Sequence, residues 1–259
     1  DRGELSLEQV VTASENIYTG IGENASTADI KVGEQVRIID LLYAALIPSA
    51  NEACNIMAEA VSGDVASFVE LMNQRAGELG MEGTHFANAH GYHDDNHYTT
   101  AYDIYLMCRE AMQYETFRTI VSSLNYTMPA TNMHEEPRIV RSTNALISNF
   151  RVFGYYYQYA TGIKTGSTPE AGYCLAASAT KNGVDLIAVV LGPGPLSLTE
   201  MTVSPCRCRA RIAIRPTPVT FRAPCLTAFS TIGWRMKLGT VQSRPSGTSV
   251  SIWSFSSKR

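Results

Sequence analysis

Apolar residues recur with a helical period along much of the first half of the chain. Side chains three and four positions apart share one face of a helix, so this spacing predicts amphipathic helices. The first three are expected at about 38–46, 51–61 and 64–79. Pro48 separates the first two, because the residue before a proline disfavours helical conformation. Gly80 is suited to end the third.

Later signals predict two more helices. Thr100-Ala101-Tyr102-Asp103 resembles a capping box, in which a threonine side chain accepts a hydrogen bond from the start of a helix. This helix is expected to reach about Met112, and a short one to follow near 114–122. Residues 81–98 have a loop-like composition, and 125–160 are expected to form loops and short strands.

A change to strand-like sequence marks the region after residue 170. Residues 172–180 and 184–191 are apolar and strand-like, and Lys181-Asn182-Gly183 lies between them. Asn-Gly between two such runs is the strongest short-range hairpin signal. Several helices followed by a late antiparallel hairpin place the chain in the α+β class.

Charge is divided unevenly along the chain. Residues 1–200 hold all 24 acidic residues and 11 of the 21 basic ones, whereas 201–259 hold 10 basic residues and no acid. We therefore predict a domain over 1–192 and a basic, Pro/Ser/Arg-rich tail over 193–259. This tail is either a solvated linker or a stretch that is not native coding sequence. A basic tail can bind nucleic acid, but this one lacks regularly interleaved aromatics, so no nucleic-acid partner is expected.

Membrane and export signals are missing from the sequence. No run of about 18 apolar residues occurs, so no membrane-spanning helix is predicted. The polar opening Asp1-Arg2-Gly3-Glu4 contains no signal peptide, and we expect this start to be internal to a longer protein. Three single cysteines among apolar neighbours are expected to be buried and inert: Cys54, Cys108 and Cys174.

Two short motifs carry side chains suited to chemistry. Ser49-Ala50-Asn51 lies in the break between two predicted helices, where a hydroxyl and an amide can project into a cleft. Lys164-Thr165-Gly166 precedes the hairpin on an expected edge strand. Its glycine lets an extended peptide lie close to the strand, and its cation and hydroxyl suit a terminal carboxylate.

The order S-x-N and then K-T-G resembles the serine penicillin-recognising enzymes. Longer stretches narrow the resemblance to the D-alanyl-D-alanine carboxypeptidases of the penicillin-binding class, over about residues 8–192. The stretches are 40–53, Phe68-Val69-Glu70-Leu71-Met72-Asn73, Thr84-His85-Phe86, Asn88-Ala89-His90-Gly91, 97–103, 162–168 and 171–175. The implied fold is an antiparallel sheet flanked by helices, with a helical subdomain and the site at their junction.

The resemblance implies a role for each motif residue. Ser49 would relay protons to the leaving D-alanine, and Asn51 would hold the substrate backbone. Lys164 and Thr165 would bind the terminal carboxylate beside Gly166, and the backbone N–H of Ser167 would form half of an oxyanion hole. The implied substrate is a peptidoglycan stem peptide ending in D-Ala-D-Ala, cleaved through an acyl-enzyme, and β-lactams would mimic it.

Further expectations follow from the same resemblance. The keywords that it implies are hydrolase, serine-type carboxypeptidase, penicillin binding, cell-wall and peptidoglycan synthesis, cell shape and secretion. The location would be extracytoplasmic, in the periplasm or on the outer face of the membrane, with peripheral association through segments outside this chain. No cofactor or metal is implied.

The sequence departs from the family at the nucleophile. The family serine belongs to an S-x-x-K motif that precedes S-x-N, and nothing before Ser49 fits this pattern. The single S-x-x-K, Ser178-Ala179-Thr180-Lys181, comes after Lys164 on a predicted strand, where residues three apart point to opposite faces. We therefore expect the nucleophile and its lysine upstream of Asp1, the fold to be incomplete at its N-terminus, and this chain alone to be inactive.

Three alternatives stand beside this interpretation. His90, His93, Asp94, Asp95 and His97 are metal-ligand types at close spacing, which a metal-dependent hydrolase would use to activate water. The chain is otherwise a non-catalytic fragment or pseudo-enzyme. Ser49, finally, is also a residue type that caps helices without any catalytic role.

Overall fold

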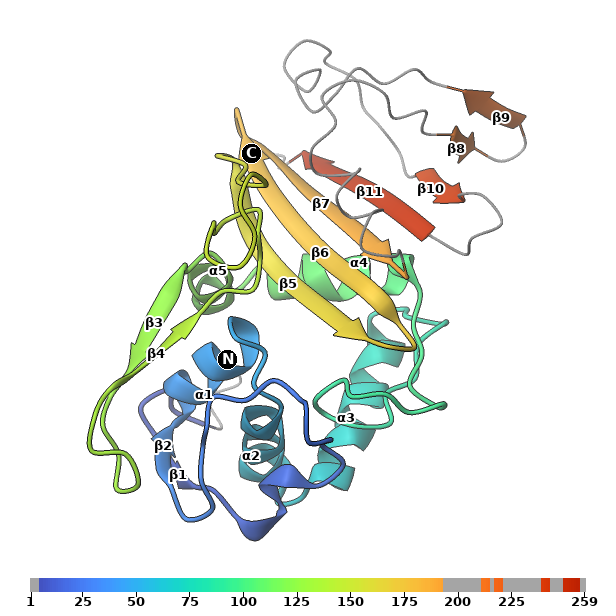
Figure 1. Ribbon diagram of the computed structural model, residues 1–259. Coiled ribbons are helices and arrows are strands. Elements are labelled where there is room, and N and C mark those ends of the chain that lie inside the picture. The colour runs from blue at the N-terminus through green and yellow to red at the C-terminus, as the bar shows by residue number, and fades with distance from the viewer. Residues whose placement is uncertain (1–4, 193–210, 215–216, 221–238, 243–248, 257–259) are drawn as a thin grey trace. The chain divides into compact units, whose positions relative to one another are not determined.

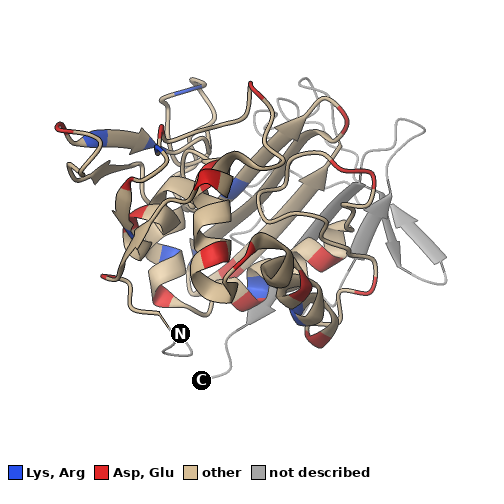
Figure 2. Ribbon diagram, turned by 90° about the horizontal axis from the view of Figure 1, so that it is seen from below, with Lys and Arg blue, Asp and Glu red and all other residues tan. Residues whose placement is uncertain are grey.

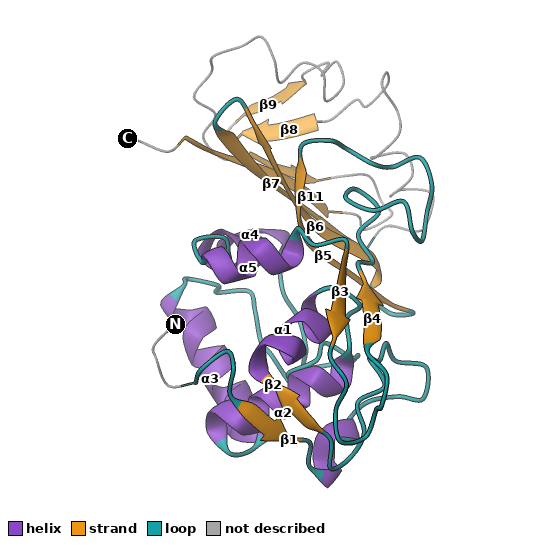
Figure 3. Cartoon of the chain, turned by 90° about the vertical axis from the view of Figure 1, so that its left-hand side faces the viewer, coloured by secondary structure: helices purple, strands orange, loops and turns teal. Residues whose placement is uncertain are grey.

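A computed structural model describes residues 5–192, 211–214, 217–220, 239–242 and 249–256 (Figure 1). The chain forms two compact units, each built from two segments. Unit 1 comprises residues 1–99 and 114–143, and unit 2 comprises 100–113 and 144–259. Helices and antiparallel sheets occur together, so the predicted α+β class is confirmed (Figure 3). The predicted division at residue 192 stays a prediction.

Unit 1 is mainly helical around an apolar centre. Its elements are β1 (Val10–Thr12), η1 (Glu15–Tyr18), β2 (Gln35–Arg37), α1 (Ile38–Leu46), α2 (Asn51–Ser62), α3 (Val65–Glu78), α5 (Glu115–Val121), β3 (Asn125–Met128) and β4 (Arg138–Arg141). Helices α1 and α2 pack together, with Leu41, Ala53 and Ile56 buried in the core. Burial of such side chains contributes most of the stabilisation of a unit of this size.

The ends of the helices follow from capping chemistry. Asp64 begins α3 by accepting a hydrogen bond from the backbone N–H of Ser67 at 2.8 Å, which satisfies an N–H that has no partner within the helix. Gly63 ends α2 with φ +84°, a left-handed conformation that costs glycine least. The predicted helices at 38–46, 51–61, 64–79 and 114–122 are therefore confirmed to within a residue or two.

Two small hairpins of unit 1 were not individually predicted. β1 pairs with β2, and β3 pairs with β4, both antiparallel. The ring of Tyr126 in β3 stacks on Tyr43 of α1, with centroids 3.7 Å apart, and its hydroxyl donates to the buried carboxylate of Asp40 at 2.7 Å. Burial, followed by the hydrogen bond and charge of Asp40, raises the pKa of Tyr126 to about 12. These contacts attach the second hairpin to α1.

Unit 2 is an antiparallel sheet with a helix packed on it. Its elements are α4 (Ala101–Ala111), β5 (Ala160–Thr168), β6 (Gly172–Lys181), β7 (Val184–Leu191), β8 (Arg211–Ile214), β9 (Thr217–Thr220), β10 (Gly239–Gln242) and β11 (Ser249–Ser256). Among the described residues, the strand order is β5-β6-β7-β11-β10-β8-β9. Helix α4 contacts β6, β7 and β11, and Thr100 caps it as predicted by accepting from the N–H of Asp103.

The predicted hairpin is confirmed as β6 and β7. Asn182 and Gly183 form its turn with φ +52° and +76°, the left-handed pair that a tight hairpin turn requires. β11 then pairs with β7 over its whole length. The four strands that follow residue 210 were not predicted, because that stretch has no steady alternation. The two interpretations of the tail concern residues that lie mostly outside the described part of the chain.

The charge and hydropathy of the described residues agree with the sequence. Acidic positions outnumber basic ones along the helices and loops (Figure 2), as expected for the acid-rich first 200 residues. Within the described part of the chain, every helix is too short or too polar to traverse a lipid bilayer.

Candidate functional site

The S-x-N motif occupies a tight break between α1 and α2. The backbone N–H of Ala50 donates to the carbonyl of Ala44 at 2.9 Å, which folds the break back onto the end of α1. Ser49 has φ +70°, a conformation that non-glycine residues rarely adopt and that is concentrated at functional sites. Helix α2 is capped by Ala50, without a side-chain hydrogen bond. The alternative in which Ser49 caps this helix is therefore wrong.

Asn51 is held by a segment from much earlier in the chain. Its backbone N–H and its side-chain Nδ2 both donate to the carbonyl oxygen of Ser26, each at 2.9 Å. A side-chain amide that donates to a fixed acceptor has a fixed orientation, so the position of the Ser26 carbonyl determines how Asn51 is presented. Sequence analysis identified Asn51 but gave no indication of this partner.

The buried carboxylate of Glu52 holds the residues that follow Ser26. Glu52 is 1% exposed. Its Oε1 accepts from the Thr27 hydroxyl and the Ala28 N–H, both at 2.7 Å, and from the Ile30 N–H at 3.5 Å. Hydrogen bonds from backbone N–H groups to a carboxylate are charge-assisted and stronger than neutral ones. We call residues Ser26 to Ile30 the strap.

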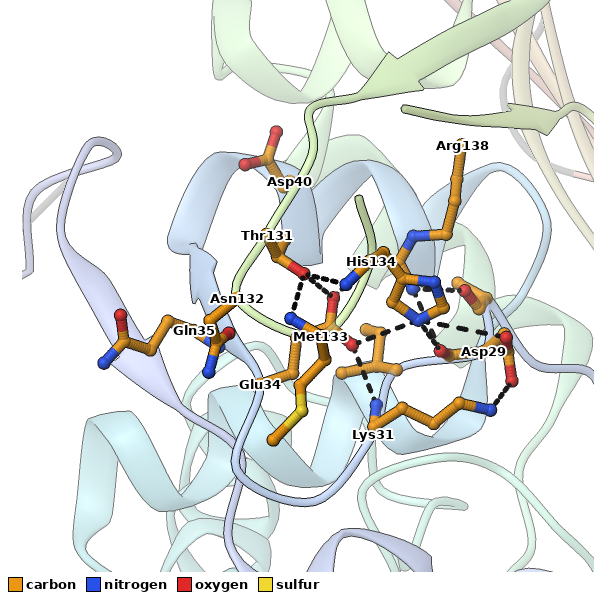
Figure 4. A network of polar contacts seen from close by, with 12 residues as sticks. Asp29, Lys31, Glu34, Gln35, Asp40, Thr131, Asn132, Met133, His134 and Arg138 are labelled. Atoms are coloured by element: carbon orange, nitrogen blue, oxygen red, sulfur yellow. Dashed lines mark hydrogen bonds and ion pairs between the residues drawn. The ribbon is translucent and has the colours of Figure 1, made fainter. Parts of the chain in front are cut away.

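A second buried carboxylate, that of Glu34, belongs to a polar network that includes Asp29 of the strap (Figure 4). Glu34 is fully buried and pairs with the guanidinium of Arg138. Arg138 also donates through Nη1 to the carbonyls of Ala28 at 3.0 Å and Asp29 at 2.9 Å. Both backbone groups of Ala28 are thus hydrogen-bonded. Its N–H donates to Glu52 of α2, and its C=O accepts from Arg138, the first residue of β4.

The K-T-G motif lies on β5, the outermost described strand at its end of the sheet. Lys164 pairs in register with Ala176 of β6, and its Nζ donates to the carbonyl of Thr165 at 2.8 Å. Lys164 and Thr165 are half-buried, whereas Gly166 and Ser167 are exposed. Exposure therefore increases along this outermost strand, which presents the cation of Lys164, the hydroxyl of Thr165 and then the backbone of Gly166, which has no side chain.

Gly166 is not required by the packing of the sheet itself. A Cβ added there would meet only the Cβ of Cys174, at 3.9 Å, which is ordinary van der Waals contact. Its φ does not lie in the left-handed region either. The fold would therefore accept alanine at this position, and the reason for glycine has to be sought in what approaches the strand.

The predicted site residues fall into two groups. Ser49 and Asn51 lie together in unit 1, and Lys164 to Ser167 lie together in unit 2. That the two groups face each other across one groove stays a prediction, as do their catalytic and binding roles.

Ser178, the serine of the misplaced S-x-x-K, lies within β6 as predicted. It is 5% exposed, and its hydroxyl is hydrogen-bonded to that of Thr161 at 2.8 Å. Lys181 lies instead over the ring of Tyr159, with its Nζ 4.6 Å from the centroid. An activated serine needs an adjacent base, but the Ser178 hydroxyl is bonded to another hydroxyl and Lys181 lies over the Tyr159 ring. Ser178 is therefore not arranged as a nucleophile.

The histidine-rich loop 81–98 uses its imidazoles structurally. His90 Nδ1 accepts from the N–H of Tyr92 at 3.1 Å, and His97 Nδ1 accepts from the N–H of Ala87 at 3.2 Å. Among the described residues, no group of three or more His, Cys, Asp or Glu is arranged to hold a metal ion. The metal-dependent alternative is not favoured, because the ring nitrogens that would be ligands accept backbone hydrogen bonds.

Acidification below pH 6.5 is expected to destabilise unit 1. Burial is the main cause that lowers the pKa values of His90 and His97 below the ordinary 6.5. At a pH near 6.5, these two histidines bind protons in the unfolded chain but not in the folded chain. The free energy of unfolding therefore falls as the pH falls from about 6.5 to the folded pKa values. Urea unfolding followed by circular dichroism at several pH values between about 5 and 7.5 measures this slope.

A double variant tests the origin of this slope. His90→Gln with His97→Gln is expected to be less stable at neutral pH but to have a flatter pH dependence. His93→Gln is the matched control in the same loop, since the His93 side chain is 40% exposed, and it should keep the wild-type slope. An unchanged slope in the double variant would contradict the assignment.

The cysteines agree with prediction only in part. Cys108 is buried, and burial raises the pKa of its thiol to about 12, which makes it unreactive at neutral pH. Cys54 and Cys174 are only half-buried, so the prediction of full burial is wrong for them. Both lie on surfaces next to the motifs, Cys54 in the first turn of α2 and Cys174 opposite Gly166.

Comparison with known proteins finds one consistent family. A family described as D-alanyl-D-alanine carboxypeptidase matches residues 1–194. The D-alanyl-D-alanine carboxypeptidase DacF of Bacillus subtilis is 34% identical over 192 residues, which cover 74% of this chain and 46% of the relative. The D-alanyl-D-alanine carboxypeptidase of Streptomyces sp. strain K15 is 33% identical over 210 residues, covering 77% and 69%.

Solved structures give the same result. The Streptomyces K15 DD-transpeptidase aligns with a TM-score of 0.67 and 32% identity over 76% of this chain and 77% of that one. A D-alanyl-D-alanine carboxypeptidase from Mycobacterium tuberculosis H37Rv aligns with a TM-score of 0.64 and 25% identity over 74% and 67%. The chain spans about half the length of its Bacillus relative.

Proposed function

Because this chain belongs to the D-alanyl-D-alanine carboxypeptidase family, we propose that it supplies the S-x-N and K-T-G parts of a serine peptidase site. The reaction is removal of the terminal D-alanine from peptidoglycan stem peptides. The observation that carries the proposal is Gly166, a bare position on an outermost strand that the fold itself does not require. An extended peptide end added along β5 would need that bare position.

The K-T-G strand would recognise the free carboxyl end of the substrate. The Lys164 ammonium and the Thr165 hydroxyl offer charge-assisted hydrogen bonds to a terminal carboxylate. The backbone N–H of Ser167, one residue beyond Gly166, would donate to the developing oxyanion. Half-burial of the cation strengthens its attraction for an anion, since partial exclusion of water lowers the local dielectric.

The S-x-N break would serve the proton transfer and the substrate backbone. The Ser49 hydroxyl would pass a proton to the amine of the departing D-alanine, and the Asn51 amide would hold the peptide preceding the scissile bond. In acylation, a serine oxygen bonds to the carbonyl carbon, the C–N bond breaks, and D-alanine leaves with that proton. Water then hydrolyses the ester. We assign no residue of this chain as the nucleophile.

The same assignment suggests partners and a location. A β-lactam carries a carboxylate and a strained amide in place of the terminal dipeptide, so it would acylate the same serine and remain attached. Peptidoglycan stem peptides occur outside the cytoplasmic membrane, which gives an extracytoplasmic location. Roles in cell-wall synthesis and cell shape would follow from trimming these peptides, and peripheral membrane association belongs to the same proposal.

Covalent labelling by a fluorescent penicillin tests the proposal. The protein as it occurs in its cell should become labelled, lose the label to competing peptides ending in D-Ala-D-Ala, and release D-alanine from a stem pentapeptide. The 259-residue chain by itself should remain unlabelled. If the cellular protein neither takes the label nor releases D-alanine, the non-catalytic alternative is correct.

A further inference from the structure

The strap is hydrogen-bonded to two groups of unit 1, the buried carboxylate of Glu52 and the ion pair that buried Glu34 forms with Arg138. Glu52 accepts hydrogen bonds from the strap N–H groups of Ala28 and Ile30. Arg138, which is paired with Glu34, donates to the strap carbonyls of Ala28 and Asp29. His134 adds a contact from Nε2 to the Asp29 carbonyl at 2.9 Å. Each of the five strap residues thus has at least one hydrogen-bonding partner elsewhere in unit 1.

Backbone strain also links the strap to the S-x-N break. Asp29 in the strap has φ +60°, and Ser49 in the S-x-N break has φ +70°. Each non-glycine residue in this conformation costs about 1 kcal/mol or more and persists only where its surroundings determine it. The strap and the break contact each other through Asn51 and Ser26, so both strained residues belong to one hydrogen-bonded assembly.

We propose that Glu52 is a positioning residue that sets the Asn51 amide through the strap. Glu52 fixes Thr27 and Ala28, these fix the neighbouring carbonyl of Ser26, and that carbonyl accepts from Asn51 Nδ2. Without the carboxylate, the buried N–H of Ala28 would lose its acceptor, and the strap would shift to find another. The Asn51 side chain would then lose its fixed orientation. The inference rests on the proposed function of Asn51 in holding the substrate.

Acylation kinetics of the cellular protein test this role. Glu52→Leu, which removes the oxygen that accepts from Thr27, Ala28 and Ile30, should lower the rate constant of labelling by fluorescent penicillin about 10- to 100-fold, since displacement by an ångström has costs of this size. The final amount of label per folded molecule should stay the same. A purely structural role would do the reverse, reducing the amount of active protein while the folded fraction reacts at the normal rate.

Two companion variants keep the test decisive. Thr27→Val removes one hydrogen bond to Glu52 and one that the Thr27 hydroxyl accepts from the Asp29 N–H at 2.8 Å, while the Ala28 N–H keeps its carboxylate acceptor. It should fold readily, with labelling slowed by a smaller factor of about 3 to 10. Glu59→Leu is the matched control on the same helix, where it removes the oxygen that accepts from the Ser14 hydroxyl at 2.9 Å. It should lose stability but label at the wild-type rate, because Glu59 makes no contact with the strap among the hydrogen bonds of the described residues.

A measurement that does not depend on acylation distinguishes this inference from the proposed function. Hydrogen exchange of the Asn51 side-chain amide, followed by NMR, should be slow in the wild type and in Glu59→Leu, and fast in Glu52→Leu. If the wild type takes no label, the proposed function fails and exchange alone decides the positioning role. Equal exchange in all three proteins, or equal slowing of labelling by Glu59→Leu, would overturn the positioning role.

Discussion

Replacing Lys164 with methionine is expected to slow acylation by fluorescent penicillin about 100-fold, or about 3 kcal/mol in transition-state free energy. The ammonium would provide the charge-assisted contacts to the substrate carboxylate, and methionine keeps the length of the side chain while removing the charge. The effect should appear at low penicillin concentration, where the second-order rate constant reports binding and acylation together. Stopped labelling reactions separated on gels measure this rate.

Lys181→Met provides the matched control for this prediction. Lys181 lies on the neighbouring strand β6, and its cation is held over the Tyr159 ring. Both substitutions remove one positive charge from unit 2, so a general electrostatic effect would slow labelling equally in the two proteins. A specific role of β5 requires Lys181→Met to react at nearly the wild-type rate. Equal slowing, or none in Lys164→Met, would contradict the assignment of the K-T-G strand.

Local signals predicted the helices and the hairpin because those elements are determined by neighbouring residues. The period of α3, its cap at Asp64 and the turn at Asn182-Gly183 depend on side chains a few positions apart. The strands after residue 210 were missed, since the short alternating runs there, such as Val250-Ser251-Ile252, do not continue as a steady pattern along the stretch. A strand such as β11 depends on pairing with β7 rather than on its own pattern.

The motif residues of the candidate site were predictable from the sequence, but the hydrogen bonds that hold them in place were not. Ser49 and Lys164 were found because two motifs in the right order resemble a known family. The strap was not, since Ser26 acts through its backbone carbonyl, which every residue possesses. Glu52 offered a faint signal, as an acid on the apolar side of a predicted helix. A charge at such a position needs buried partners, and sequence alone does not locate them.

The removal of Arg138 is expected to have the largest effect on stability. Arg138→Met should lower the free energy of unfolding by about 3–5 kcal/mol, because it leaves the carboxylate of Glu34 buried without its cation. Glu34 is fully buried, whereas the Arg138 side chain is 15% exposed. The carbonyls of Ala28 and Asp29 would lose their hydrogen bonds from Arg138 at the same time. Urea unfolding at pH 7 measures the loss.

Two further variants show whether the loss comes from an uncompensated charge. Arg75→Met breaks an ion pair with Glu78 in which both side chains are more than 40% exposed, and it should cost about 1 kcal/mol or less. Glu34→Gln in the Arg138→Met background should recover part of the stability, since a neutral amide is less costly to bury than a carboxylate that has lost its guanidinium partner. If the second substitution adds to the loss instead, the stabilisation comes from the shape of the Arg138 side chain and its carbonyl contacts, and Glu34 is not destabilised by losing its cation.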